Sequence, residues 1–165
     1  ASIAPIVGQN WGANKKSRVL KAVKYCYVMC CVWSAFILTL LYFLAEPISQ
    51  ALSSDAAIAK ESSSYLGIAT IGLWGYGIVI VSAAAFNALG RPMSSLGYYL
   101  LRTALLYVPL SVLAGIYFDI KMVYYAIAAA NVLSGLTVGW YTLWWLKKAN
   151  VCDYPQNDLD SKISQ

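Results

Sequence analysis

Residues 25–45 read YCYVMCCVWSAFILTLLYFLA, an apolar run that contains no charged residue. A helix rises about 1.5 Å per residue, so roughly 20 apolar residues are enough to cross the hydrocarbon core of a bilayer. Apolar runs extend from Tyr25 to Ala45, from Tyr65 to Leu89, from Thr103 to Phe118 with an apolar approach from Met93, and from Met122 to Leu146. We therefore predict an all-α transmembrane bundle with spans over about 22–45, 65–89, 94–118 and 122–146.

The composition agrees with a protein that faces lipid. The chain has 165 residues, of which 60% are hydrophobic and 12% are charged, and it lacks the polar alternation of a half-exposed helix or strand. Its formal charge of +5 could suit nucleic acid. The basic residues, however, lie beside the ends of the apolar runs and form no patch. We expect membrane lipid as a partner and no nucleic acid.

The third run is short for a span, and a basic residue directly precedes it. Arg102 precedes the run that starts at Thr103. An arginine near a helix end can extend its apolar stem along the lipid and place its guanidinium among the headgroups. We expect Arg102 to be such an anchor at the cytoplasmic end of the third span.

The charges between the spans predict the orientation of the bundle. Lys and Arg concentrate in cytoplasmic loops, because positive loops resist translocation. The segment before the first span is strongly basic, the next loop is net acidic, and the last span is followed by Lys147 and Lys148. The basic residues before the first span are Lys15, Lys16, Arg18, Lys21 and Lys24. Both ends of the bundle are therefore predicted to be cytoplasmic.

The two ends of the chain differ from the spans. Residues 1–13 begin with a short apolar run and lack the basic region and cleavage site of a signal peptide, so we interpret them as the cytoplasmic end of an earlier transmembrane helix. Residues 149–165 are polar, and we expect a disordered cytoplasmic tail there.

Neither a metal site nor an enzyme active site is indicated by the residues. The chain has no His, and Cys26 and Cys30 would offer only two ligands on one helix face. No nucleophile, base and orienting partner share a suitable spacing. We expect no metal, no cofactor and no catalytic residue.

Small and polar residues inside the spans leave two questions open. Glycines are dense in the second span and recur at Gly135 and Gly139 in the fourth, which indicates either tight helix packing or a helix that bends and shifts. No acidic residue lies at mid-depth, so the chain offers no proton relay or carboxylate cation site of its own. Asn131 is the strongest candidate for a cleft-facing polar group, with a hydrogen bond between helices as the alternative role.

Two cytoplasmic segments resemble the signatures of the multidrug and toxic compound extrusion family, the MATE transporters. The first is APIVGQNWGANKKSR, residues 4–18, and the second is FNALGRPMSS, residues 86–95. The residues that match are Pro5, Gly8, Gln9, Gly12, Ala13 and Arg18 in the first segment, and Asn87, Gly90, Arg91 and Pro92 in the second. Gly-Arg-Pro also suits a helix stop with a cytoplasmic positive charge.

The resemblance implies a protein of twelve helices in two six-helix halves. Residues 1–148 would then be part of the C-terminal lobe, from the end of the eighth helix through the twelfth, in a bacterial inner membrane. The resemblance also implies exchange of amphipathic, often cationic organic compounds for Na⁺ or H⁺ by alternating access. Since residues 65–89 contain no acid, the chain resembles the DinF branch more than the NorM branch. The coupling ion would be bound by the N-terminal half of the same polypeptide.

The resemblance also suggests roles for residues. Trp74, Tyr76, Asn87 and Asn131 are the candidates for a substrate cleft that accepts flat organic cations or drugs. The motif residues Pro5, Gly8, Gln9, Gly12, Arg18, Gly90, Arg91 and Pro92 are assigned to structure and gating.

Two other functions remain open. A flippase for lipid-linked oligosaccharide or polysaccharide, from the same superfamily, would need a cleft lined by Arg and Lys, and the spans are poor in both. A small membrane subunit that transports nothing by itself would be a gene product of about this chain's own length.

Overall fold

The computed structural model describes residues 3–52 and 55–149, and these are almost entirely helical. The elements are α1 (Ile3–Gly12), α2 (Lys16–Leu52), α3 (Ala56–Ala69), η1 (Thr70–Gly72), α4 (Leu73–Ala88), α5 (Pro92–Leu100), η2 (Leu101–Tyr107), α6 (Val108–Tyr117) and α7 (Ile120–Lys148). No strand occurs in the described part of the chain, so the predicted all-α class is confirmed. The predicted disordered tail lies beyond the described residues.

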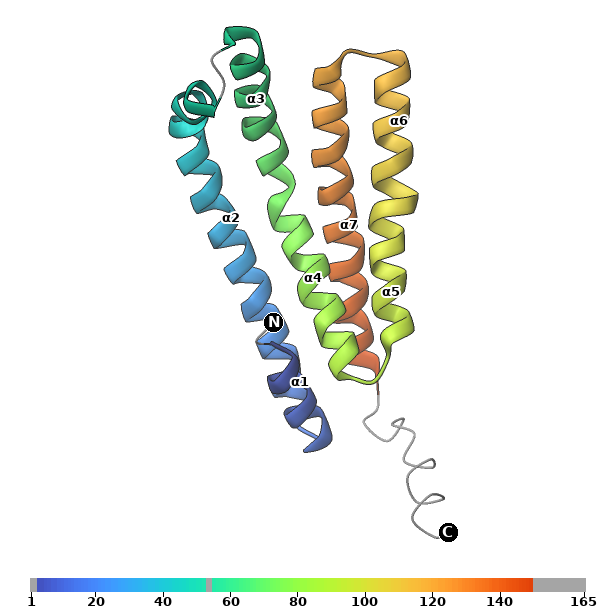
Figure 1. The fold of residues 1–165 in the computed structure, drawn as a ribbon. Coiled ribbons are helices and arrows are strands. Elements are labelled where there is room, and N and C mark those ends of the chain that lie inside the picture. Colours follow the sequence, from blue (N-terminus) through green and yellow to red (C-terminus); the bar gives the residue numbers. More distant parts are fainter. Residues whose placement is uncertain (1–2, 53–54, 150–165) are drawn as a thin grey trace, which may run out of the picture.

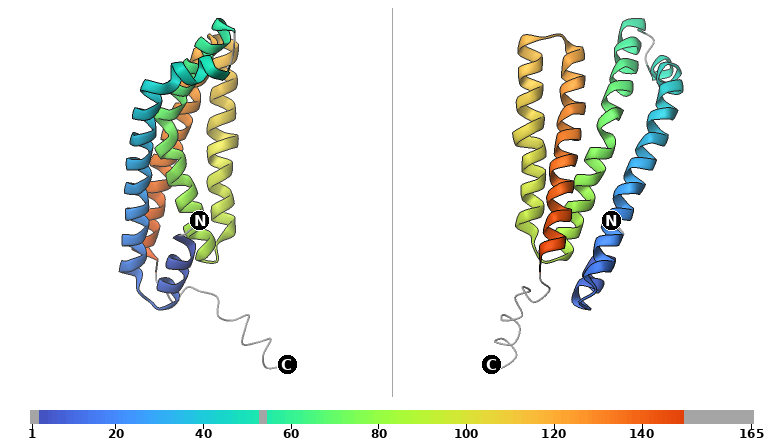
Figure 2. Two further views of the ribbon diagram at one scale, coloured as in Figure 1. Left: turned by 60° about the vertical axis from the view of Figure 1, so that its left-hand side comes forward. Right: turned by 180° about the vertical axis from the view of Figure 1, so that it is seen from behind.

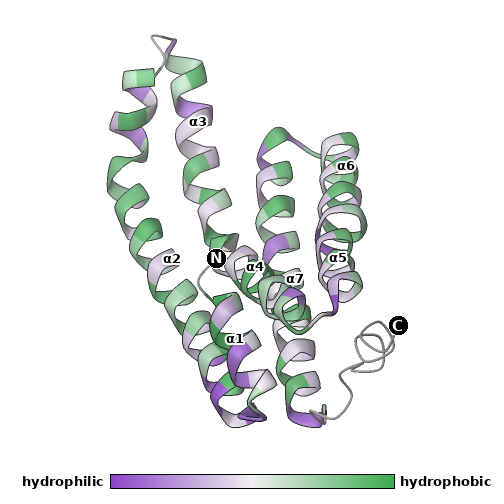
Figure 3. Cartoon of the chain, turned by 60° about the horizontal axis from the view of Figure 1, so that its bottom comes forward, coloured by the Kyte–Doolittle hydropathy of each residue, from purple (hydrophilic) through white to green (hydrophobic). Residues whose placement is uncertain are grey.

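Four helices are long and apolar enough to cross a bilayer, which confirms the number of spans. They are Lys16–Leu52, Ala56–Ala88, Pro92–Tyr117 and Ile120–Lys148, the second and third being continuous through η1 and η2. All four begin before their predicted bounds and the first and fourth also end later, because helical hydrogen bonding continues into polar sequence once the apolar part has formed a helix. Figure 3 shows hydrophilic residues near the ends of α1, α2 and α3. Hydrophobic residues dominate the middle of α2.

The spans form two hairpins that meet at α4 and α7. α2 lies beside α3 and α4 on one side, and α5 and α6 lie beside α7 on the other, with α1 at the lower end of α2 and α4 (Figures 1 and 2). Of the most apolar window of each span, 44% of residues are buried for the α4 and α7 spans, against 11% for α2 and 6% for the α5–α6 span. The α4–α7 pair is thus the centre of the structure.

Glycine decides how closely α4 and α7 approach. A Cβ atom added to Gly72 would lie 2.7 Å from the carbonyl oxygen of Ala128. A Cβ on Gly75 or Gly135 would overlap the backbone of the opposite helix, since Gly75 faces Asn131 and Gly135 faces Gly75. Of the two roles left open for these glycines, tight packing is present in the structure.

The third span differs from the prediction, and the difference changes the place of Arg102. The helix begins at Pro92 and is continuous to Tyr117, so Arg102 lies about 15 Å along its axis and near its middle. Residues 101–107 form a π-helical segment, in which the N–H of Val108 donates to the carbonyl of Thr103. Pro109 provides the reason, because it has no N–H to offer the carbonyl of Leu105 and so favours a wider turn.

Candidate functional site

The turn between α4 and α5 is built by the second motif. Gly90 has a φ of 72°, the left-handed conformation that glycine adopts at the end of a helix. Its N–H donates to the carbonyl of Asn87, and the N–H of Arg91 donates to the carbonyl of Phe86 at 2.9 Å. Pro92 then begins α5 at a position where its missing N–H costs nothing. Gly90, Arg91 and Pro92 therefore stop one helix and start the next, as the sequence predicts.

The same turn is attached to α7 and α1 by aromatic side chains. The guanidinium carbon of Arg91 lies 4.7 Å from the ring centroid of Trp145 on α7. Trp145 also packs against Phe86, with centroids 4.9 Å apart, and stacks on Trp11 of α1 at 5.9 Å. These four residues, the Trp145 cluster, hold α1, α4 and α7 together at one end of the bundle.

The first motif closes α1 and starts α2. Asn14, with a φ of 58°, is the left-handed residue after α1, and the N–H of Lys15 donates to the carbonyl of Asn10 at 2.8 Å. Lys16 then reaches the end of α7, where its ammonium donates to the carbonyls of Lys147 and Ala149. A positive charge at carbonyls of a helix C-terminus is favourable, so Lys16 joins the first and last spans.

The other residues of the first motif differ in what they contact. Gly8 faces α4, where an added Cβ would lie 3.7 Å from the carbonyl oxygen of Ala88. The residues Pro5, Gln9, Gly12 and Arg18 are exposed. Their gating role stays a prediction, and within the described chain it is α1 itself, through Ile3, Val7 and Trp11, that packs on the bundle.

The candidate cleft residues Tyr76 and Asn131 are brought together by Arg102. The Nε of Arg102 donates to the Oδ1 of Asn131 at 3.0 Å. The guanidinium carbon of Arg102 lies 4.0 Å from the centroid of the Tyr76 ring. Tyr76 is about 18 Å from the end of α4 and Asn131 about 17 Å from the start of α7, so the group lies near mid-depth. The interpretation of Arg102 as a headgroup anchor is therefore wrong.

A small cavity lies beside Tyr76, between α2 and α4. Its volume is about 260 Å³. It is lined by Cys30, Trp33 and Ser34 of α2 and by Leu73, Tyr76, Gly77 and Ile80 of α4. The α4 residues recur at helical spacing, and Ala84 and Ala88 continue the same face toward α1, where they pack on the core. Tyr76 thus lies on the same face of α4 as Ala84 and Ala88, farther from the Trp145 cluster.

The other two cleft candidates lie elsewhere. Trp74 is half-buried and packs against the core cluster that joins α1, α2 and α4, because two residues along a helix separate it from Tyr76 by about 200°. Asn87 is exposed at the end of α4, where its carbonyl caps the turn. The structure therefore does not join Trp74 or Asn87 to the Tyr76–Arg102–Asn131 group.

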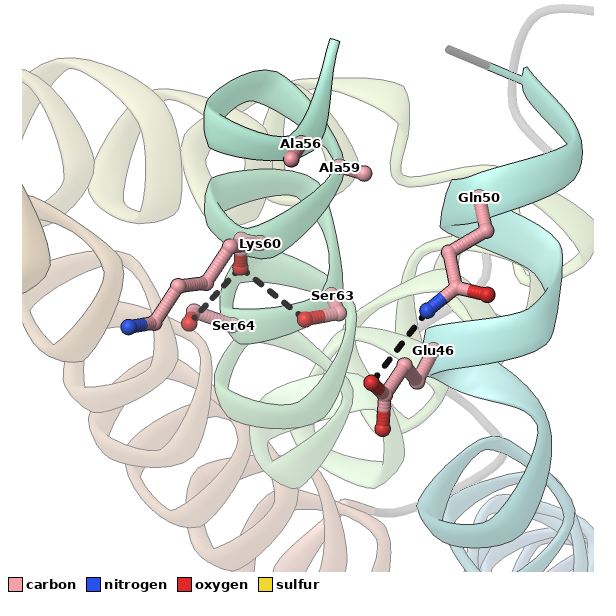
Figure 4. A pocket seen from close by; sticks show the side chains of 7 residues that line it. All are labelled: Glu46, Gln50, Ala56, Ala59, Lys60, Ser63 and Ser64. Carbon is pink, nitrogen blue, oxygen red and sulfur yellow. Dashed lines mark hydrogen bonds between the residues drawn. The ribbon is translucent and has the colours of Figure 1, made fainter. Parts of the chain in front are cut away.

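A larger cavity of about 690 Å³ lies at the far ends of α2 and α3. Its polar side chains are occupied within their own helices: Gln50 donates to Glu46 at 3.3 Å, and the hydroxyls of Ser63 and Ser64 donate to the carbonyl of Lys60 (Figure 4). The ammonium of Lys60 points away from Glu46 (Figure 4). This cavity lies near the helix ends and far from Arg102, so we place no cleft there.

Arg102 was not predicted from the sequence to join Tyr76 and Asn131. The available signal was Pro92, which marks the start of a helix and so places Arg102 well inside the span. Acidic partners are also missing from the middle of the described spans, since Glu46 and Glu61 lie toward helix ends and Asp55 and Asp119 lie in the loops. In the described part of the chain, no three His, Cys, Asp or Glu side chains come close enough to hold a metal ion.

The chain belongs to the MatE family, whose model matches residues 1–113. It is 32% identical over 136 residues to a protein of Shewanella oneidensis named FAD transporter, and the match covers 82% of this chain and 30% of that protein. Members of this family are membrane transporters, which separates the chain from enzymes. The chain is part of a multi-pass membrane protein.

Solved structures share the fold. The Vibrio cholerae MATE transporter VcmN in its bent form has 21% sequence identity and a TM-score of 0.83, with 88% of this chain and 33% of that one covered. The inward-facing conformation of a multidrug resistance MATE family transporter has 18% identity and a TM-score of 0.74, with 90% and 36% covered. The chain thus spans about a third of the length of the relatives it matches.

Proposed function

We propose that this chain is part of the C-terminal lobe of a secondary exporter that moves small organic compounds across the membrane by alternating access. The observation that carries the proposal is the MatE family model, which matches residues 1–113 and so includes both cytoplasmic motifs. In the structure these motifs end α1 and α4 and join both helices to α7. A lobe whose helices are fixed at one end is suited to rocking as a unit against a second lobe.

The partner of this lobe in the proposal is the N-terminal half of the same polypeptide. The curated relative is about three times as long as the matched region, because the match covers 30% of it. The coupling ion, Na⁺ or H⁺, would bind in that half, since the described spans contain no acid at mid-depth. The basic residues around the start of α2 and at the end of α7 support cytoplasmic placement of both of these ends in a bacterial inner membrane.

Organic cations are the first candidate cargo. Tyr76 at the edge of the α2–α4 cavity offers an aromatic face of the kind that binds such cations. In the structure, however, the guanidinium of Arg102 already lies 4.0 Å from the centroid of this ring. An organic cation would have to displace Arg102 from the ring and approach a positive charge.

FAD, or a similar flavin nucleotide, is the second candidate, and one observation favours it. The relative that is 32% identical over 136 residues is named FAD transporter. A flavin combines a flat ring system with phosphates, and both an aromatic face and a guanidinium are present at the Tyr76–Arg102–Asn131 group.

The first test is the size of the native protein and its transport. A tag at the C-terminus of the native gene should give a membrane protein near the length of the relatives, and inverted vesicles should accumulate FAD or a fluorescent organic cation when an ion gradient is imposed. Asn131→Ala should lower this transport without lowering the amount of protein in the membrane. A native product of about 165 residues, or vesicles that move neither compound, would overturn the proposal.

A further inference from the structure

The position of Arg102 raises a problem of charge. Arg102 lies near the middle of its span, in the π-helical segment at residues 101–107, and its side chain is half-buried. A charged arginine inside a bilayer is costly unless it faces a protein interior or a water-filled cavity and is paired. Its contacts should therefore show what compensates the charge.

Neutral groups alone contact the guanidinium in the described part of the chain. Asn131, which is 7% exposed, accepts one hydrogen bond from Nε through Oδ1. The ring of Tyr76 lies against the guanidinium. A guanidinium has five N–H donors, so four of them have no hydrogen-bond acceptor among residues 3–52 and 55–149.

No carboxylate among residues 3–52 and 55–149 lies at mid-depth to supply the negative charge. The seven acidic residues are Glu46, Asp55, Glu61, Asp119, Asp153, Asp158 and Asp160. The four that the structure describes, Glu46, Asp55, Glu61 and Asp119, lie in loops or within about two turns of a helix end, outside the apolar middle of the spans. Arg102 is also fixed in place from two helices, because Asn131 belongs to α7 and Tyr76 to α4.

We propose that Arg102 binds the anionic group, a phosphate or carboxylate, of an aromatic cargo. This inference rests on the proposed transport function and specifies the chemistry of its cleft. Asn131 is the positioning residue, because its hydrogen bond to Nε leaves the terminal Nη atoms of the fork free to accept an anion in bidentate geometry. Tyr76, whose ring carries the guanidinium on one face, also lines the α2–α4 cavity beside the anion site.

The experiment compares ligands that share a ring but differ in charge. The full-length protein in nanodiscs is titrated with FAD and with riboflavin, which has the same ring system without phosphates, and binding is followed by flavin fluorescence. Arg102→Gln should weaken FAD binding by about tenfold to a hundredfold, the worth of one charge-assisted interaction, and leave riboflavin binding unchanged. Lys121→Gln, an exposed cation at the start of α7, is the control and should change neither.

Two further measurements separate the roles and guard against a variant that fails to fold. Asn131→Ala should weaken FAD binding less than Arg102→Gln does. The FAD affinity of Arg102→Lys should lie between those of the wild type and Arg102→Gln, because lysine keeps the charge but lacks the planar guanidinium. In the unmodified protein, pyrophosphate should compete with FAD and should not compete with riboflavin. This competition needs no variant, so it tests the anion site even where Arg102→Gln does not accumulate.

The outcomes are distinct. FAD binding that is unchanged in Arg102→Gln, or riboflavin binding that falls equally, would overturn the anion site while leaving transport by the wild-type protein intact. Wild-type vesicles that transport nothing would overturn the proposed function instead. Competition by a lipid-linked diphosphate, and none by soluble pyrophosphate, would assign the anion to a lipid and contradict the soluble cargo.

Discussion

The two central spans, which contain α4 and α7, and the outer span of α5 and α6 have similar hydropathy but different surroundings. The most apolar windows have mean hydropathies of 1.8 and 1.4 for the spans of α4 and α7, and 1.6 for the span of α5 and α6. Yet 44% of each central window is buried, against 6% of the third span. Hydropathy therefore predicts that a helix lies in the membrane, but it does not predict whether the helix contacts protein or lipid there.

Residue size explains the contrast. Where α4 and α7 cross, Gly72, Gly75 and Gly135 allow backbone contact. On α6 the outward side chains are large, and Val112, Leu113 and Ile116 are all more than half exposed. Apolar burial does not drive helices together in lipid, so close packing needs small residues, and large ones are tolerated on a lipid-facing surface.

The strongest way to break the central pair is Gly135→Leu. The added side chain overlaps the backbone of Gly75, so the helices must separate, at a cost of about 3 kcal/mol or more. We expect a large loss of monodisperse protein after heating, measured by size-exclusion chromatography. Gly97→Leu on α5, where an added Cβ meets nothing within 4 Å, is the matched control and should behave like wild type. Equal behaviour of the two variants would contradict the packing account.

A smaller effect is expected from the polar contact between α2 and the central pair. The hydroxyls of Tyr27 and Ser82 are 2.6 Å apart, and both residues are buried. Tyr27→Phe should lower the free energy of unfolding by about 0.5–1.5 kcal/mol, since the Ser82 hydroxyl still donates to the carbonyl of Ile78. Tyr25→Phe, which removes the same group from a residue that is 71% exposed, should cost nothing measurable in the same thermal assay.

Arg91→Gln tests the attachment of the α4–α5 turn to α7. The contact with Trp145 is at an exposed site, so its loss should cost about 0.5–1 kcal/mol. Hydrogen exchange of the backbone at residues 89–93 should become faster, while exchange in the middle of α4 stays unchanged. Uniform acceleration along α4 would show that the turn holds the whole helix.

The smallest effect on stability is expected on the outer span of α5 and α6. Ile116 on α6 is 69% exposed, and Ile116→Ala should change stability by less than about 0.5 kcal/mol. Ile78→Ala, the same change at a residue of α4 that is 8% exposed, should cost about 2 kcal/mol or more. A large cost for Ile116→Ala in the full-length protein would mean that another part of the protein covers α6.

Much of the fold could be predicted because it depends on local properties. The four spans, the stop at Gly90 and the helix end before Lys15 follow from apolar length, a left-handed glycine and the motif spacing. The bounds were less accurate, since Asp55 caps α3 with its side chain and so starts the second span at Ala56, well before its apolar run. The candidate site was predicted in part: Tyr76 and Asn131 meet at Arg102, and Trp74 and Asn87 do not.

The sequence by itself determined that the chain is helical, crosses a membrane four times and contains the two family motifs, because these depend on runs and short patterns of neighbouring residues. Only the tertiary structure decided which helices form the centre and where Arg102 points. Its hydrogen bond to Asn131 joins residues far apart in the chain, and its place at mid-depth depends on a helix that starts at Pro92 and widens before Pro109. Such contacts follow from how the helices cross, and no local pattern specifies the crossing.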